Sequence, residues 1–488
     1  MSFANQSGDL SPFTEVVPDA ARVGGLTKSS ILTQRRRCRV TPQTGASYGS
    51  AGSGAANQQI QFLIADQGGL IDLRSACLTY TVQTTGTAVC VDDGHPFGTV
   101  QVLMNGQLMD NIQSAMKLTN IEMKAGGSQG YYKSAGSFQG FELLNGDLAQ
   151  ASVATGTVNT AWGDVQSNLA GIAARQKRAA DAKWNSVAGE QRSIPLGLMT
   201  GVGRMKQYLP IALTGELSLV LVTGSAPEVT LVNSSATTGD YSLVGVSLEY
   251  DVVVPDQRYM SLLQKIASDP SDSGLNIPFE STIMTTGASI AASASALTES
   301  SIIVSRATNH LLRAHVVQIP TGMLSARNYP SQSCFGHAGT WSYQMRIGSQ
   351  VYPQVATAGD ASMFNTSLAA YGSVLQENGS VINRSLWANA TDATTAGTPA
   401  VYETAEGTTT TSAKYWGADS AIFGYGFQTV KGAAEPLEVD GVSLAGASGS
   451  QLIVSLVSAP SVAYTPYVAL VALKFLRAAG GAVQVVGA

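Results

Sequence analysis

The sequence predicts an all-β protein in which one domain occurs twice. From residue 60 onward, runs rich in β-branched and aromatic residues alternate with Gly, Asn, Asp and Pro, as expected for strands and turns. Charged residues make up only 12% of the 488 residues, which fits either a surface covered by neighbouring chains or a host bias towards Ala and Gly codons. Two segments, LSLVLVTGSAPEVT at 217–230 and LIVSLVSAPSVA at 452–463, both break at Ser-Ala-Pro.

Residues 1–57 are expected to form an N-terminal arm, because Pro, Gly and Ser separate isolated apolar residues there. The opening MSFANQSGDLSPF has neither a basic start nor an apolar run, so we expect no secretory signal. The arm contains the cluster RRRCR at 35–39, which is either a solvated turn or a contact with an acidic surface or nucleic acid. Its arginines are Arg35, Arg36, Arg37 and Arg39.

The first domain is expected over residues 58–255. LTYTVQT and SLVGVSLEYDV show the alternation of half-buried strands. The dipeptide Asn105-Gly106, set between two apolar runs, is a strong signal for a β-hairpin. Residues from about 164 to 190 are rich in Ala, Gln, Lys and Arg at helical spacing, so we expect a helical insertion there.

A linker with a short helix is expected over residues 256–277. Pro255 and Asp256 are residues that favour the start of a helix. The apolar residues expected on one face of this helix are Tyr259, Leu262, Leu263 and Ile266.

The second domain is expected over residues 278–480, followed by a C-terminal tail at 481–488. Strand-like runs resume in this part of the chain. An Ala/Thr/Ser/Gly-rich stretch from about 359 to 413 interrupts them, and it is too long for an ordinary loop in a compact domain. We therefore expect a long insertion.

The duplication rests on three features that occur in the same order in both halves. GTVQVLMNGQLMD starts at Gly98 and GTWSYQMRIGSQVYP starts at Gly339, and both read as strand, Gly turn, strand. The Ser-Ala-Pro motif follows 127 residues after Gly98, at Ser225, and 119 residues after Gly339, at Ser458. A further strand follows each motif. This pattern predicts two consecutive eight-stranded antiparallel jelly rolls, with long loop insertions and a few short helices.

No catalytic, cofactor-binding or metal-binding residue is expected. His95 beside Asp92 and Asp93 reads as a polar turn between strands. GVGRMK at 201–206 has a Gly-x-Gly without the strand and helix of a nucleotide site, so it reads as a loop.

The other histidines and the cysteines carry no stronger signal. His310 and His315 are an odd number of residues apart, which places them on opposite faces of a strand. Cys334 and His337 form a conceivable nucleophile pair without a third orienting residue. No zinc spacing occurs, and we expect free thiols at Cys38, Cys77, Cys90 and Cys334.

Several segments resemble the double-jelly-roll major capsid proteins of tailless icosahedral double-stranded DNA viruses, the lineage of adenovirus hexon, virophages and Polinton-like viruses. They are LIDLRSACLTYTV, FGTVQVLMNGQLMD, YDVVVPDQRYMSLLQ, WSYQMRIGSQVYPQ and EPLEVDGVSL. The Asn-Pro-Gln-type segment of giant-virus capsid proteins is absent, so the resemblance is to the virophage and Polinton-like type.

This resemblance implies a structural protein and no enzyme. Three chains would form a pseudo-hexagonal capsomer that tiles an icosahedral shell around viral DNA. The arm and its four arginines would contact neighbouring capsomers, minor capsid or penton proteins, DNA or an inner layer. The protein would be made in the host cytoplasm or nucleus and reside in the virion, with no small-molecule substrate.

Two alternatives differ in class. A secreted surface-layer or fibre protein would need an export signal, which the opening residues do not provide. A jelly-roll carbohydrate-active enzyme would need paired carboxylates in a cleft, and the sequence offers no convincing pair.

Overall fold

The structure is a computed structural model of the full chain. It describes residues 32–49, 54–65, 68–85, 89–91, 94–126, 135–136, 138–140, 189–232, 240–268, 274–291, 300–304, 308–321, 341–358, 360–370, 423–427, 441–444, 450–456, 463–479 and 482–486.

The first half of the chain forms two facing sheets. The strand order in one is β1 (Leu32–Val40), β11 (Asp240–Pro255), β4 (Leu70–Thr85) and β8 (Glu190–Pro195), with β2 (Ser47–Tyr48) also paired to β11. The order in the other is β3 (Gln59–Ile64), β9 (Leu217–Thr223), β6 (Phe97–Met104) and β7 (Gln107–Gln113).

The second half repeats this arrangement. The strand order in its first sheet is β12 (Leu275–Thr286), β19 (Tyr464–Ala479), β14 (Leu311–Pro320) and β17 (Phe423–Gly426), with β20 (Ala482–Val486) also paired to β19. The order in its second sheet is β13 (Ser300–Ile303), β18 (Ser450–Leu456), β15 (Trp341–Ile347) and β16 (Gln350–Ala358).

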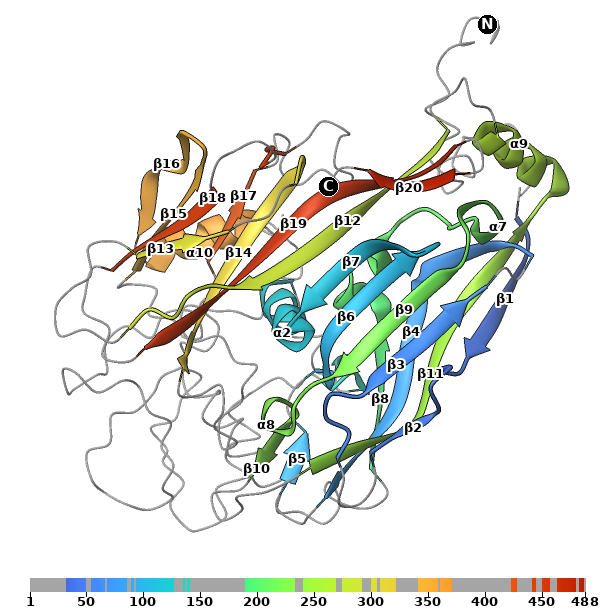
Figure 1. The fold of residues 1–488 in the computed structure, drawn as a ribbon, viewed down its shortest axis with the longest axis horizontal. Coiled ribbons are helices and arrows are strands. Elements are labelled where there is room, and N and C mark those ends of the chain that lie inside the picture. The colour runs from blue at the N-terminus through green and yellow to red at the C-terminus, as the bar shows by residue number, and fades with distance from the viewer. Residues whose placement is uncertain are drawn as a thin grey trace, which may run out of the picture.

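The two halves have one topology. When the eight main strands of each half are ranked in chain order, both halves give the sheet orders 1-8-3-6 and 2-7-4-5. This is the jelly-roll arrangement of two interleaved sheets. The predicted double jelly roll is therefore confirmed, and Figure 1 shows the two units side by side.

The two units share one sheet. Strand β7, the fifth strand of the first unit, pairs in parallel with β12, the first strand of the second, at Asn111 and Ile283. This contact merges a sheet from each unit into a single sheet of nine strands. We call the region around β7 and β12 the seam.

Smaller elements decorate the two units. A short two-stranded sheet pairs β5 (Val89–Val91) with β10 (Thr230–Val232). The remaining elements are α2 (Ala115–Gly126), α6 (Leu196–Met199), the 3₁₀ turn η4 (Val202–Arg204), α7 (Ile211–Thr214), α8 (Ala226–Val229), α9 (Gln257–Ser268) and α10 (Asp360–Ala370).

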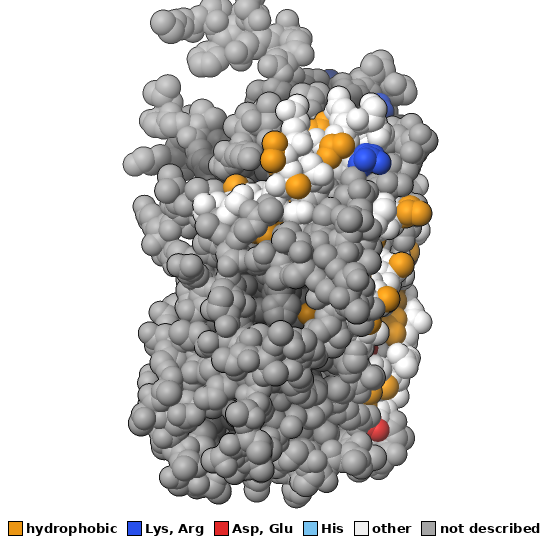
Figure 2. All heavy atoms as spheres, turned by 90° about the vertical axis from the view of Figure 1, so that its left-hand side faces the viewer, with side chains coloured by type: hydrophobic (Ala, Val, Ile, Leu, Met, Phe, Trp, Pro, Cys, Tyr) orange, Lys and Arg blue, Asp and Glu red, His pale blue; other side chains and the backbone are white. Residues whose placement is uncertain are grey.

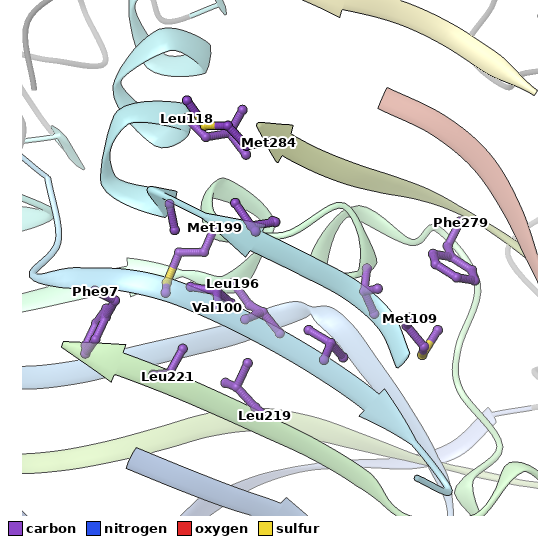
Figure 3. Packing of buried hydrophobic residues seen from close by; sticks show 14 of the residues in the cluster. Phe97, Val100, Met109, Leu118, Leu196, Met199, Leu219, Leu221, Phe279 and Met284 are labelled. Atoms are coloured by element: carbon purple, nitrogen blue, oxygen red, sulfur yellow. The ribbon is translucent and has the colours of Figure 1, made fainter. Parts of the chain in front are cut away.

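The predicted Asn-Gly hairpin joins β6 to β7. Asn105 and Gly106 have φ values of 48° and 78°, the left-handed pair that a tight two-residue hairpin needs and that Asn and Gly adopt most easily. The alternating pattern of β9 buries Leu217, Leu219 and Leu221. Figure 3 shows two of these leucines packed beside Val100 of β6 and beneath α6.

The Ser-Ala-Pro motif marks equivalent strands in the two units. In the first, β9 pairs with β6 and ends at Thr223, and Ser225 then begins α8, where Glu228 accepts a hydrogen bond from the Ser225 N–H at 3.1 Å. In the second, β18 pairs with β15 and ends at Leu456, while Ser458 lies outside the described residues. Strand pairing thus stops before the first motif, as expected for a proline-containing segment.

The predicted arm requires a correction. Residues 32–40 form β1, which pairs antiparallel with β11 over its whole length. The arginines occur in a strand because each alternate side chain meets an acidic residue of the sheet, a signal that composition alone does not carry. The first jelly roll therefore includes residues 32–40, which the composition assigns to the arm, and residues 1–31 lie outside the described residues.

The linker helix is confirmed as α9. The Asp256 carboxylate accepts a hydrogen bond from the Arg258 N–H at 2.8 Å and caps the helix. The helix places Tyr259, Leu262, Leu263 and Ile266 on one side, as predicted, where Leu263 and Ile266 are buried and Leu262 is 38% exposed. Strand β12 starts at residue 275, three residues before the expected boundary.

The other expected segments are described in part. Residues 482–486 of the predicted tail form β20 on the edge of β19. The start of the expected insertion at 359–413 forms α10, and the rest of it lies outside the described residues. The helical insertion expected at 164–190 also lies outside them up to residue 188.

Candidate functional site

Asp110 lies at the centre of the seam and is 1% exposed. One carboxylate oxygen accepts hydrogen bonds from the Gly201 N–H at 3.0 Å and the Val202 N–H at 3.4 Å. The other accepts a hydrogen bond from the Thr282 N–H at 2.8 Å. One side chain of β7 thus joins the η4 turn of the first unit to β12 of the second.

The environment of Asp110 opposes its charge. Burial raises the pKa of Asp110 to about 6, while the backbone N–H donors and Lys474 act in the opposite direction. Burial also lowers the pKa of Lys474, which Asp110 in turn raises. This buried carboxylate holds the two units in position, because its removal would leave several buried N–H groups without a partner.

A chain of ion pairs crosses the seam beside Asp110. Arg204 binds both oxygens of Glu122 from α2 at 2.9 Å, and its guanidinium lies 3.8 Å from Glu280 of β12. Glu280 also accepts hydrogen bonds from Arg313 of β14 at 2.8 and 3.2 Å. Two acids and two arginines from four elements therefore alternate across the two units.

The four groups in this row of ion pairs stabilise one another's charged forms. Burial alone would raise the pKa of Glu280, but Arg313 and Arg204 outweigh it and hold the pKa below its usual value. The pKa of Arg204 is raised, since Glu122 and Glu280 outweigh the effect of its burial. All four groups are at most 31% exposed, so solvent screens them less than a surface pair.

Gly201 permits the close approach of the two units. A Cβ atom at this position would lie 1.9 Å from the backbone carbonyl oxygen of Glu280. No L side chain fits there without a shift of the backbone, because the obstacle is main chain and not a flexible side chain. The interpretation of GVGRMK as a loop did not identify this close contact between the units. Its Gly-x-Gly pattern was the feature of the sequence that could have indicated it.

Apolar and mixed contacts complete the seam. Figure 3 shows Leu118 of α2 next to Met284 of β12. The Lys117 ammonium lies 5.4 Å from the centre of the Tyr467 ring on β19, a distance at which a cation and a ring attract. The Ser281 hydroxyl donates to the Met109 carbonyl at 3.0 Å.

The arginine cluster forms an ionic ridge on the first unit. Arg35 binds Asp251 at 2.7 Å and Asp72 at 3.0 Å, and Arg37 binds Asp251 at 3.1 Å. Arg39 lies farther away, 3.8 Å from Glu249. Arg36 is exposed on the same strand. The side chains of Arg35, Arg37 and Arg39 are 54%, 45% and 61% exposed, so the ridge is both held in place and accessible.

His95 differs from its expected role as a polar turn. Its ring is 2% exposed, and the Phe97 N–H donates to its Nδ1 at 3.2 Å, which leaves Nε2 to donate to the Thr119 hydroxyl at 2.9 Å. Burial lowers the pKa of His95 to about 3, so it is a neutral core residue.

The remaining candidates are not brought together. His315 is buried in β14, while His310 precedes that strand and its ring meets Phe475 edge-on. Cys38 and Cys77 are free thiols. Cys334 and His337, Asp92 and Asp93, and the side chain of Cys90 lie outside the described part of the chain.

The described residues contain neither a metal-binding cluster nor a membrane-spanning helix. Among them, no three His, Cys, Asp or Glu side chains are grouped so that they could hold a metal ion. Likewise, none of the helices described has the length and apolar character to cross a membrane.

Comparisons with known proteins bear on the fold. No family model matches the sequence, and no curated protein does so either. Solved structures do match over nearly the whole chain.

Three of the solved structures are virus capsid components. PBCV-1 VP54 fitted into a reconstruction of the virophage Sputnik is 13% identical, with a TM-score of 0.51, and the match covers 96% of this chain and 100% of that one. The Faustovirus major capsid protein is 8% identical, with a TM-score of 0.54 and coverages of 95% and 94%. A chain of the Sputnik virophage structure is 12% identical, with a TM-score of 0.51 and coverages of 95% and 90%.

These matches establish that the chain has the fold of the double-jelly-roll major capsid proteins. The TM-scores for Sputnik and for the PBCV-1 and Faustovirus proteins are nearly equal. The expected placement on the virophage and Polinton-like side therefore stays a prediction.

Proposed function

We propose that this chain is a major capsid protein, which assembles as a homotrimeric, pseudo-hexagonal capsomer and tiles an icosahedral shell around viral DNA. The observation that carries the proposal is the duplicated topology, with the two units joined through one shared sheet. Two equivalent units in one chain give three chains six similar lobes, which suits a nearly hexagonal lattice. Closed rings of identical chains are the usual form of such assemblies.

The seam supports a structural role. Polar side chains of the seam form hydrogen bonds and ion pairs between the two units. Examples are the hydrogen bonds of Asp110 and the row of ion pairs that runs from Glu122 to Arg313. Such contacts fix the relative orientation of the units, which a lattice of capsomers requires. We propose no catalytic role, and the partners we infer are further copies of the chain, with minor capsid and penton proteins at other contacts.

Light scattering after size exclusion tests the proposal. We expect the purified full chain to elute with the mass of three 50.5 kDa chains or as larger shells. A protein that stays monomeric at every concentration would contradict the proposal.

A further inference from the structure

The two outer edges of the chain correspond to the two strands that meet at the seam. Among the described strands, β16 pairs only with β15, and β1 pairs only with β11. In chain order, β16 and β7 are the fifth main strands of their units. Likewise, β1 and β12 are the first main strands of theirs. Figure 1 shows β16 and β1 at opposite ends of the molecule.

We propose that β16 of one copy lies beside β1 of the next copy in the capsomer, and so repeats between chains the β7–β12 junction within each chain. This inference rests on the proposed trimer and names the surfaces that build it. The contact is head-to-tail, because two different edges meet, and head-to-tail contacts close into rings when the rotation permits. Junctions within and between chains would then alternate around the ring.

The β16 edge has the character of a surface that a neighbour covers. Val355 of this strand is 81% exposed, and Val351 and Pro353 are partly exposed. Figure 2, which views the molecule from this end, shows hydrophobic side chains spread over its described part with few charges among them. An edge strand with exposed valines invites pairing unless a partner covers it.

The charges at the two junctions are inverted. Glu280 is the only charged residue of β12, and Arg204 of the first unit meets it across the seam. Strand β1 instead carries four arginines and no acid, and acids of its own unit pair with Arg35, Arg37 and Arg39. Because these three side chains stay 45–61% exposed, an acidic or neutral side chain of a neighbour fits beside them better than a basic one.

Substitutions on the two edges test the contact. Val355→Lys places a charge on the β16 edge, and Arg39→Glu reverses the charge of the side chain that is more exposed than those of Arg35 and Arg37. We expect each to shift the trimer to monomer, with at least a ~10-fold rise in the dissociation concentration. Ile303→Lys is the matched control, because Ile303 is 68% exposed on β13, the opposite edge of the same sheet, and we expect it to leave the trimer intact.

Folding and assembly are separated in the same experiment. The melting temperature and circular dichroism of each variant should match those of the wild type at concentrations where both are monomeric. If the wild type is trimeric and both edge variants stay trimeric, the edge contact is wrong while the capsid proposal stands. If the wild type is itself monomeric, the proposed function fails first.

Cross-linking provides a second, independent readout. A chain with Val355→Cys and Arg39→Cys is treated with a short bismaleimide, and each single variant serves as a control for the native thiols. We expect linked dimers and trimers from the double variant only, because the strands that carry the two positions, β16 and β1, lie at opposite ends of one chain. The absence of linked chains in a sample that is trimeric by light scattering would overturn the edge contact.

Discussion

At the residue scale, single atoms decide how closely the two units approach. No residue other than glycine fits at position 201, because a Cβ atom there would lie 1.9 Å from the Glu280 carbonyl oxygen. We expect Gly201→Ala to destabilise the fold by about 2 kcal/mol or more, the cost of forcing a packed backbone apart. Chemical denaturation measures this, with Gly426→Ala as the control, because its nearest neighbour would be 3.4 Å away. Equal stability of the two variants would show that the seam is loose.

Asp110 gives a prediction about pH. Its pKa is raised by burial to about 6, so the protonated carboxyl is favoured in the folded state. The contribution of this group is therefore greatest below pH ~4 and declines as the pH rises through ~6, by about 3 kcal/mol in full. We expect the stability advantage of the wild type over Asp110→Asn to shrink between pH 4 and pH 7. An advantage that grows over this range would contradict the assignment.

Glu280 gives the opposite dependence. Its pKa is held below the usual value because Arg313 and Arg204 outweigh burial. Its stabilising contribution is thus present above the ordinary carboxyl pKa and is lost as the pH falls through the lowered value. We expect Glu280→Gln to cost about 1–3 kcal/mol at pH 7 and progressively less as the pH falls below the ordinary carboxyl pKa. In a double-mutant cycle with Arg313→Met, additive effects of the two substitutions would exclude the ion pair.

For single residues, the sequence predicted the position of a turn but not the contacts of a buried side chain. Asn105 and Gly106 were predictable because a tight hairpin needs left-handed residues, and the chain supplies the two best ones. Asp110 was not predictable, because its donors come from segments 91 and 172 residues away. Only the folded seam brings them together.

At the element scale, β1 shows where composition misleads. A run of arginines looks like a solvated arm, but every second one meets an acid on β4 or β11. The duplicated hairpins, by contrast, were readable because alternation, a Gly turn and the Ser-Ala-Pro end recur in order. Long-range charge pairing leaves no such local pattern.

Truncation tests the role of β1. We expect a chain that begins at residue 32 to keep the folded domains, because β1 retains all its pairs with β11. Removal of residues 1–41 should expose the edge of β11 and give aggregated or unfolded protein. Thermal melting and solubility of the two truncations distinguish these outcomes, and equal behaviour would mean that β1 contributes nothing.

At the scale of the whole molecule, two jelly rolls are joined through one sheet of nine strands. The fold class was predictable from the repeat, because both units obey one strand order. The seam was not, since it depends on how the two units meet, and no periodicity within either unit encodes that. Under the proposed assembly, the same seam geometry repeated between chains would give a six-lobed ring from three copies.

Negative-stain electron microscopy of the purified full chain tests the central claim most directly. The account predicts particles with six similar lobes in a nearly hexagonal outline, each built from three chains. Fields of separate two-lobed particles would contradict it.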